Sequence, residues 1–357
     1  MKKSREKFFA SILFILAIGF TIGLSEITLR IKHKKLKLIN YVEENWNLVS
    51  WEFPIQHDSN LGWIPKVNSQ VKSADSKTIM NLIDWGIRSN GGVFPGSTSK
   101  DSILAVGASH VFGSQVSDSD TWPAILEKES KFRVINGGVF AYGFDQVILR
   151  MEDLVSKIHP ERIIIGVHPD NLSQTVMSQK YAKKPYFDIS NNELVLKNTP
   201  VPITKKGLNP YQAVMGYSYL VHYLMTRLSP QVWLENHGEI KAHNKSHEVS
   251  CLLIKRADYF CRSHNIKCSL LFQYFHTTAP EAREQVIKLT PCIKNTEINL
   301  WDPYEALEEF KKNDLKRHET LFDFHMTPQG NAWMANYVLQ KINHKNRLSS
   351  FELVQGD

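Results

Sequence analysis

Three residues have the types and the spacing that nucleophilic catalysis needs: Ser109, Asp323 and His325. Ser109 follows the apolar stretch 102–107, which ends in a glycine, as a strand does where it breaks into a turn. Asp323 and His325 lie two residues apart, just before a proline and a helical pattern. A serine hydroxyl becomes a nucleophile when a histidine takes its proton and a carboxylate orients that histidine. If these parts of the chain meet in space, they predict the acyl chemistry of a serine hydrolase or acyltransferase.

The elements that must position these residues alternate along the chain. Strands are predicted at 103–106, 133–135, 162–167, 268–272 and 298–301, and helices at 122–129, 144–158, 248–263, 281–288, 303–312 and 328–343. Such alternation predicts a doubly wound α/β domain, in which helices cover both faces of a parallel sheet. A serine at the carboxyl end of a strand lies where such a sheet places its chemistry.

An apolar run near the N-terminus predicts a membrane anchor. Residues 8–25 carry no charge, and at about 1.5 Å per residue they nearly cross a ~30 Å hydrocarbon core. A cleaved signal peptide is the alternative, but the run is long for one and no small-x-small site follows it. Basic residues flank both ends, so they leave the orientation open. Much of the formal charge of +7 lies in these flanks, which favours a membrane surface over nucleic acid.

The predicted organisation follows from this pattern. We expect a basic tail at 1–7, a transmembrane anchor at 8–30, a stalk or small lobe at 31–98, an α/β domain at 99–345 with an insertion at about 173–217, and a tail at 346–357. The four cysteines are Cys251, Cys261, Cys268 and Cys292. None forms a CxxC pair, so no metal site or other cofactor is implied. They are buried thiols or, outside the cytoplasm, one or two disulfides.

Four blocks of sequence, in this order, resemble the SGNH hydrolases, or GDSL family. They are 106–113 (VGASHVFG), 136–146 (NGGVFAYGFDQ), 166–171 (GVHPDN) and 323–330 (DFHMTPQG). The anchor with Glu26 and Arg30, together with 61–63 and 84–88, resembles the start of the membrane-anchored bacterial branch linked to cell-surface polysaccharides. The resemblance implies a flavodoxin-like fold and a triad of Ser109, His325 and Asp323. It also implies three oxyanion donors, from the Ser109 N–H, a second-block N–H and a third-block Asn.

The sequence departs from the family pattern at three places. Ala108 replaces the supporting Asp before the serine. Ala141 stands where the oxyanion glycine aligns, and its N–H serves equally well unless the site needs a positive φ. Asp170 aligns with the oxyanion Asn, although an ionised carboxylate has no proton to donate. A shift of one residue puts Asn171 there instead, and we favour Asn171.

The resemblance implies a membrane-anchored serine esterase that cleaves O-acyl groups, most simply O-acetyl groups, from a cell-envelope glycan. The chain would cross the inner or plasma membrane once, with its domain in the periplasm or outside the cell. Its partners would be the acylated polysaccharide and the membrane, and not nucleic acid. Three alternatives stay open. One is an O-acetyltransferase that uses the same triad, and another is a catalytically degenerate glycan-binding or assembly protein. The third is a lipid esterase that works near the anchor and acts on long acyl chains.

Other polar residues have less specific interpretations. His110 and His168 flank the predicted site as structural or substrate-binding residues, and His276 is a further candidate for a substrate contact. The basic residues of the predicted insertion form a solvated loop or attract an anionic polysaccharide. They are Lys180, Lys183, Lys184, Lys205 and Lys206.

Overall fold

The computed structural model describes residues 2–45, 54–72, 78–92, 101–274 and 280–352. The chain divides into two compact units. The anchor unit comprises Met1–Phe53, Gln179–Ala182 and Thr204–Ile240, and the sheet unit comprises Pro54–Ser178, Lys183–Ile203 and Lys241–Asp357. Each unit is described by itself.

The sheet unit is built on five parallel strands in the order β14-β13-β7-β5-β6. These strands are β5 (Ser102–Gly107), β6 (Arg133–Asn136), β7 (Arg162–Val167), β13 (Lys267–Phe272) and β14 (Asn299–Trp301). In chain order the arrangement is 2-1-3-4-5, the flavodoxin-like order, and its winding reverses between β5 and β7. The predicted doubly wound parallel sheet is therefore confirmed.

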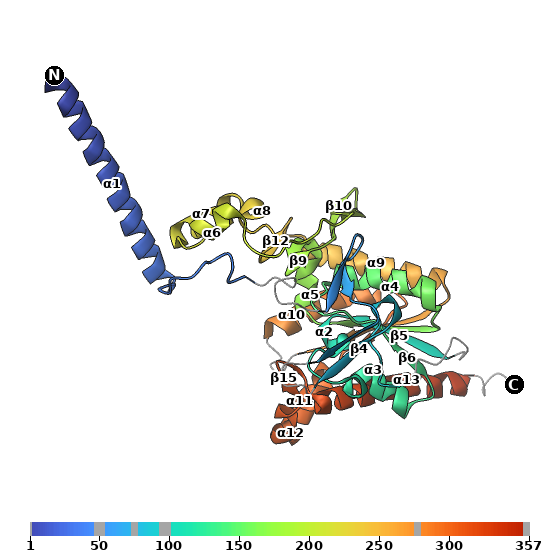
Figure 1. Ribbon diagram of the computed structural model, residues 1–357. Coiled ribbons are helices and arrows are strands. Elements are labelled where there is room, and N and C mark those ends of the chain that lie inside the picture. Colours follow the sequence, from blue (N-terminus) through green and yellow to red (C-terminus); the bar gives the residue numbers. More distant parts are fainter. Residues whose placement is uncertain (1, 46–53, 73–77, 93–100, 275–279, 353–357) are drawn as a thin grey trace. The chain divides into compact units, whose positions relative to one another are not determined.

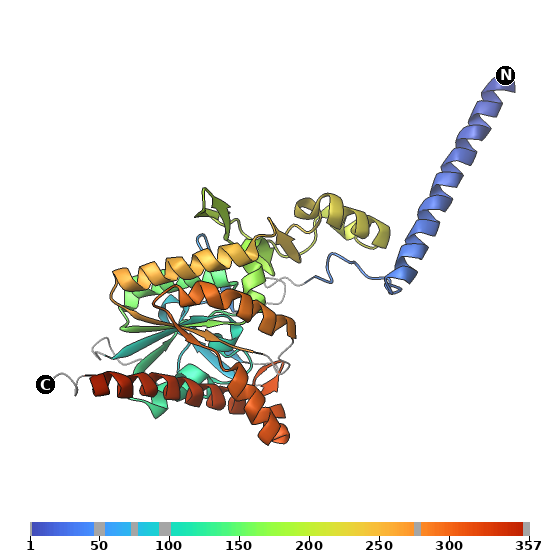
Figure 2. The ribbon, with the colours of Figure 1, turned by 180° about the vertical axis from the view of Figure 1, so that it is seen from behind.

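Helices cover both faces of this sheet, as Figures 1 and 2 show. On one face lie α4 (Phe144–Ile158) and α9 (Ser246–Ser263), and on the other lie α3 (Trp122–Glu129) and α13 (Pro328–Glu352). The β7 side chains are buried on both faces, which explains its continuous apolar run. The other helices of the sheet unit are α2 (Ser109–Phe112), α5 (Asp170–Ser173), α10 (Pro280–Lys294), α11 (Tyr304–Asn313), α12 (Leu315–Glu319), η1 (Asp84–Gly86), η2 (Asp118–Asp120) and η3 (Gln174–Val176).

The predicted stalk is divided differently in the structure. Its part from residue 54 onward belongs to the sheet unit, as antiparallel pairs that fold onto the second sequence block. Trp63 is buried there, its Nε1 donates to the Phe140 carbonyl at 3.3 Å, and Tyr142 donates its hydroxyl to the Trp63 carbonyl at 2.5 Å. The strands concerned are β1 (Ile55–Asp58), β2 (Gly62–Pro65), β3 (Ser69–Lys72) and β4 (Ile79–Leu82).

The predicted insertion also has other boundaries. Residues 183–203 stay with the sheet unit, because the buried Lys184 ammonium pairs with Asp145 of α4. This segment holds the hairpin of β10 (Tyr186–Ser190) and β11 (Glu193–Lys197). Residues 204–240 belong to the anchor unit instead. The predicted C-terminal tail is helical as far as Glu352, where α13 ends.

The anchor unit joins α1 (Lys2–Lys32) to three short helices. These are α6 (Pro210–Met215), α7 (Tyr219–Leu228) and α8 (Pro230–Trp233). A small core of Val42, Trp233, Leu234 and Ile240 holds them together. The segment Arg5–Lys32 is long and apolar enough to cross a membrane. Strands β8 (Met177–Lys180), β9 (Ala182–Lys183) and β12 (Glu239–Lys241) lie where the chain passes from one unit to the other.

Candidate active site

Ser109 lies directly after β5, beside the point where the winding of the sheet reverses. The strand register pairs Gly107 with Gly166, so the carboxyl ends of β5 and β7 are neighbours. Connections leave two such strands in opposite directions, which opens a crevice at their carboxyl ends. The residues that follow β7, from His168 to Asn171, therefore lie at the same edge of the sheet as Ser109.

Two glycines let the turn that carries Ser109 approach the strand ends closely. A Cβ atom on Gly107 would lie 2.3 Å from Cγ2 of Val111, and one on Gly166 would lie 2.4 Å from the same atom. No larger residue fits at either position without moving its neighbour. Val111 fills this space and thereby fixes α2 on the sheet.

Arg88 holds the other end of α2. Its Nη1 donates to the carbonyl of Phe112 at 2.8 Å and also to the carbonyl of Gly113. Its Nη2 donates to the Val116 carbonyl at 2.5 Å, and its Nε pairs with Asp118 at 3.1 Å. A buried guanidinium is tolerated when its donors are satisfied in this way. Arg88 thus ties the residues that follow Ser109 into one rigid loop.

His325 approaches Ser109 from near the C-terminal end of the chain. Its Nε2 lies 2.8 Å from Ser109 Oγ, which is hydrogen-bond distance. Its backbone N–H donates to Gln115 Oε1 at 2.9 Å and so ties β16 (His325–Met326) to the loop after α2. The two parts of the chain therefore meet, in the arrangement of a nucleophile and its general base.

Asp323 is placed less decisively. It pairs with His325 in the short ribbon of β15 (Phe322–Asp323) and β16, so the two side chains leave the same face. The Asp323 carboxylate is nevertheless exposed. The structure describes hydrogen bonds of His325 to Ser109 and to Gln115. The role of Asp323 as third member of a triad stays a prediction.

Two further histidines lie beside His325. The His110 ring stacks on that of His168, with centroids 5.5 Å apart and planes at 7°, and lies 5.1 Å from that of His325. Burial lowers the pKa of His325 to about 4. Burial, followed by the nearby His325, lowers the pKa of His168 to about 3, and burial also holds the pKa of His110 well below its usual value. All three rings are therefore neutral near pH 7, the form in which His325 accepts a proton.

The second block contributes Ala141, which adopts a positive φ of 63°. This is the left-handed region that glycine favours, and there an alanine costs about 1 kcal/mol. The hydrogen bonds of Trp63 and Tyr142 on either side hold the backbone in this conformation. Alanine serves as well as glycine only where the backbone needs no positive φ, and here it does need one. The turn therefore keeps its shape at the cost of local strain. Its part in an oxyanion hole stays a prediction.

The third block separates Asp170 from Asn171. The Asp170 side chain is 66% exposed, and its Oδ2 lies 3.6 Å from His168 Nδ1. Asn171 is buried, and its Oδ1 accepts a hydrogen bond from the His168 N–H at 3.1 Å. That bond engages the acceptor end of the carboxamide and leaves its Nδ2 as the donor end. The environment of Asn171 suits an oxyanion donor better than that of Asp170, but neither role is tested.

Sequence reasoning missed part of this site. It assigned no role to Arg88 or Gln115, whose contacts depend on tertiary packing and leave no local signal. It gave no special weight to His110 and His168, although one follows Ser109 directly and the other lies in the third block. His276 lies outside the described residues.

The cysteines form two disulfides, Cys251–Cys292 and Cys261–Cys268. Of the two interpretations that the sequence allowed, buried thiols or disulfides, the structure therefore has the disulfides. His247 lies close to the first of these pairs. Because both sulfur atoms of that pair are bonded to each other, neither is a thiolate ligand for a metal.

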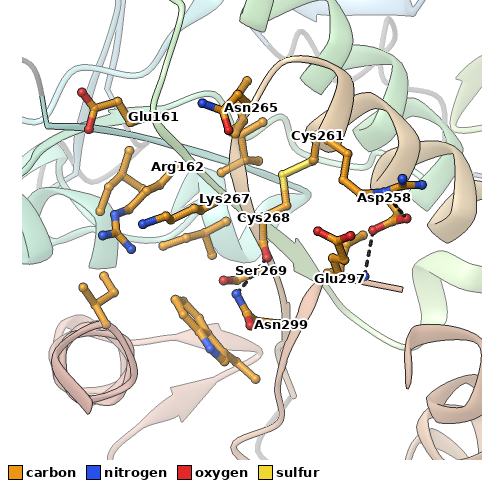
Figure 3. A pocket seen from close by; sticks show the side chains of 18 of the residues that line it. Glu161, Arg162, Asp258, Cys261, Asn265, Lys267, Cys268, Ser269, Glu297 and Asn299 are labelled. Carbon is orange, nitrogen blue, oxygen red and sulfur yellow. Dashed lines mark hydrogen bonds and ion pairs between the residues drawn. A yellow bond between two sulfur atoms is a disulfide. The ribbon is translucent and has the colours of Figure 1, made fainter. Parts of the chain in front are cut away.

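A cleft of about 900 Å³ lies at the opposite end of the sheet (Figure 3). Arg162, Lys267 and Asn299, which begin β7, β13 and β14, are among the residues that line it. The Cys261–Cys268 disulfide lies in its wall. Ser109 and His325 do not line this cleft.

No family model and no curated protein matches the chain. Solved structures do match it. A GDSL-like lipase from Bacteroides thetaiotaomicron is 13% identical, with 70% of this chain and 92% of that chain covered and a TM-score of 0.36. An acetylxylan esterase from Geobacillus stearothermophilus is 12% identical, with 68% and 94% covered and a TM-score of 0.42. A protein of the G-D-S-L family from Desulfitobacterium hafniense is 13% identical, with 66% and 97% covered and a TM-score of 0.34.

Proposed function

We propose that the protein is a membrane-anchored serine esterase of the SGNH type, which removes O-acyl groups, most simply O-acetyl groups, from a cell-envelope glycan. The observation that carries the proposal is the 2.8 Å contact between Ser109 Oγ and His325 Nε2. The contact lies at the switch point of the parallel sheet, where ligands of such folds bind. The neutral state of His325 near pH 7 is the one that the reaction requires.

In the first half-reaction, Ser109 Oγ attacks the carbonyl carbon of the ester while its proton passes to His325 Nε2. The carbonyl oxygen becomes an oxyanion, stabilised by the backbone N–H groups of Ser109 and Ala141 and by Nδ2 of Asn171. Removing one such donor raises the free-energy barrier of the reaction by about 3–4 kcal/mol. The C–O bond to the sugar then breaks, and His325 gives its proton to the departing sugar oxygen.

In the second half-reaction, water attacks the acyl-Ser109 ester and His325 takes a proton from it. The tetrahedral species collapses, the proton returns to Ser109 Oγ, and the free acid leaves. If a sugar hydroxyl takes the place of water, the same residues catalyse O-acetyl transfer. Asp323 would stabilise the imidazolium of His325 in both halves.

The end of α1 supports a retained anchor rather than a cleaved leader. The Glu26 carboxylate accepts hydrogen bonds from the backbone N–H groups of Tyr219 and Leu220, at 2.8 and 2.7 Å. Arg30 donates to the Tyr217 carbonyl at 2.6 Å. Cleavage beyond Arg30 would remove both contacts, so they argue against a cleavage site at the end of α1.

The disulfides support the proposed compartment, since such bonds persist in oxidising surroundings outside the cytoplasm. We propose a single crossing of the inner or plasma membrane, with the sheet unit in the periplasm or outside the cell. The test is the mass of the mature chain and the protease sensitivity of its sheet unit in intact and opened cells.

The substrate class rests on the family resemblance together with one feature of the site. Phe324 is 65% exposed, and its ring lies edge-on to that of His325, with centroids 4.9 Å apart. An exposed aromatic ring beside the catalytic base offers a surface for the apolar face of a sugar. The lysines contribute less than the sequence suggested, since Lys184 is buried against Asp145 and Lys180 pairs with Glu239.

The experiment measures acetate release from an acetylated glycan, and from p-nitrophenyl acetate, by the full chain in detergent. Ser109→Ala should abolish both activities. Ser156→Ala is the matched control, because its exposed hydroxyl donates only to the Asp153 carbonyl within α4. A folded wild type without turnover, or turnover that survives Ser109→Ala, would contradict the proposal. Acetyl transfer to an added sugar would identify a transferase.

A further inference from the structure

The helices of the anchor unit expose more apolar surface than their size explains. Seven large apolar side chains are exposed within 204–240, as many as in the whole described part of the sheet unit. They are Tyr211, Val214, Met215, Tyr217, Leu224, Leu228 and Val232. The other side of these helices is accounted for, because Val221 and Met225 pack on the small core around Trp233. Exposed apolar side chains at this density mark a surface that contacts something other than water.

The position of these side chains follows from the attachment of α7 to α1. Glu26, which accepts hydrogen bonds from the first N–H groups of α7, follows the last residue of the uncharged run 8–25. Ser218 also donates its hydroxyl to Glu26, at 2.9 Å. The N-terminus of α7 therefore lies at the level where the apolar part of α1 ends. If α1 crosses a bilayer, this is the boundary between hydrocarbon and head groups.

The exposed side chains lie close to that level. Val214 precedes Ser218 by four residues, so even an extended chain keeps the two within about 14 Å. Leu224 follows Leu220 by four residues of helix, which is about 6 Å. Val214 is 73% exposed and Leu228 is 75% exposed. Figure 1 shows α6 and α7 beside the C-terminal end of α1.

The residues around these side chains suit a lipid surface. Tyr211 and Tyr217 are of the amphipathic type that gathers at the interface between hydrocarbon and head groups. Lys32, the last residue of α1, is exposed, as are Lys34 and Lys37 just after it and Arg227 on α7. Such cations attract anionic head groups.

We infer that α6, α7 and α8 form a foot that binds the surface of the same bilayer that α1 crosses. Their exposed apolar side chains would enter it about 5–10 Å deep, between head groups and acyl chains. This surface is distinct from the site at Ser109. The inference rests on the part of the proposed function that makes α1 a retained anchor, and not on the esterase activity.

The test places a nitroxide label at single cysteines of the full chain in nanodiscs of phosphatidylcholine and phosphatidylglycerol. The native cysteines are all in disulfides and do not compete for the label. The test positions are Val214→Cys and Leu228→Cys. Tyr259→Cys on α9 is the matched control, since Tyr259 is 70% exposed but belongs to the sheet unit. Leu16→Cys within α1 reports on the anchor.

The inference predicts that labels at Val214 and Leu228 collide more with oxygen than with a water-soluble nickel chelate, as the label at Leu16 does, whereas the label at Tyr259 shows the reverse. If the labels at Val214 and Leu228 behave like the label at Tyr259 while the label at Leu16 lies in lipid, the inference of a foot is wrong and the anchor stands. Immobilised labels shielded from both reagents would overturn it in favour of a protein partner or second copy. A water-accessible Leu16 would overturn the anchor and the foot together.

Discussion

The two ends of the parallel sheet differ in what they offer a substrate. The amino end has the cleft of about 900 Å³, with charged residues such as Arg162 and Lys267 in its wall (Figure 3). The carboxyl end has Ser109 in contact with His325, and beside them two stacked histidines with lowered pKa values. A cleft shows only where a ligand could fit. Titratable groups that contact one another and have shifted pKa values are typical of a catalytic site. The comparison therefore favours the carboxyl end as the place of the proposed reaction.

The most direct test of this comparison removes one side chain at each end of the sheet. His325→Ala removes the general base and should lower kcat/KM by about 10²–10⁴-fold. Lys267→Ala, at the amino end, should leave kcat/KM unchanged. Steady-state hydrolysis of p-nitrophenyl acetate measures both. An equal loss in the Lys267 variant would show that the cleft takes part in the reaction.

A second pair of substitutions compares the stability cost of removing a buried lysine with that of removing an exposed one. Lys184 is buried against Asp145, and its Nζ also donates to the carbonyls of Gln174 at 3.1 Å and Pro185 at 2.8 Å. Lys184→Met leaves the buried carboxylate unpaired, so the free energy of unfolding should fall by about 3–5 kcal/mol. Lys267→Met, at an exposed site, should change it by less than about 0.5 kcal/mol.

Urea unfolding of the full chain in detergent measures these free energies. The double variant Lys184→Met with Asp145→Leu should recover most of the loss, because it removes both charges. A Lys184→Met variant as stable as wild type would show that the pair is not buried in solution.

The histidines make the carboxyl end sensitive to pH. Because burial lowers the pKa of His325 to about 4, the base stays neutral and kcat/KM should hold from pH 7 down to about 5, then fall through pH 4. Stability responds over a higher range. Below pH 6.5 a histidine binds a proton in the unfolded chain but not in the folded chain, where its pKa is lowered. The free energy of unfolding should therefore fall as the pH drops toward 4, by about 1.4 kcal/mol per pH unit for each group.

A pH–rate profile and urea unfolding at pH 7 and pH 5 check the two effects. A kcat/KM that falls already through pH 6.5, the ordinary histidine pKa, would show that His325 is not buried as described.

The smallest expected effect concerns Asp323. Its carboxylate is exposed, so its interaction with the His325 imidazolium is screened and is worth about 1 kcal/mol or less. Asp323→Asn should therefore lower kcat roughly fivefold, measured in the same hydrolysis assay. A loss near 10⁴-fold, as for a buried triad acid, would show that Asp323 closes onto His325 during the reaction.

Local signals were enough to predict the strands of the sheet and the helices that cover it. The predicted helices 122–129 and 144–158 coincide with α3 and α4, and the predicted strand 162–167 coincides with β7. These segments have strong periodicity or a continuous apolar run, which packing then uses directly. Ser109 and His325 could be paired because the family order of blocks joins the two ends of the chain.

What sequence reasoning missed depends on contacts between distant residues. Residues 54–72 and 78–92 looked irregular because their order comes from Trp63 and Arg88, which reach into other parts of the sheet unit. The helices at 210–233 are short, and the hydrogen bonds from α7 to Glu26 cross almost two hundred residues. The positive φ of Ala141 could not be foreseen either, since tertiary hydrogen bonds impose it.

The central claim is that Ser109 is activated by His325. Treatment of the full chain with a fluorophosphonate, followed by mass spectrometry of the modified peptide, tests it most directly. The account predicts one adduct, on Ser109, which is lost in Ser109→Ala and His325→Ala and retained in Ser156→Ala. A folded wild type that does not react, or an adduct on another residue, would contradict the account and favour a binding protein on the same fold.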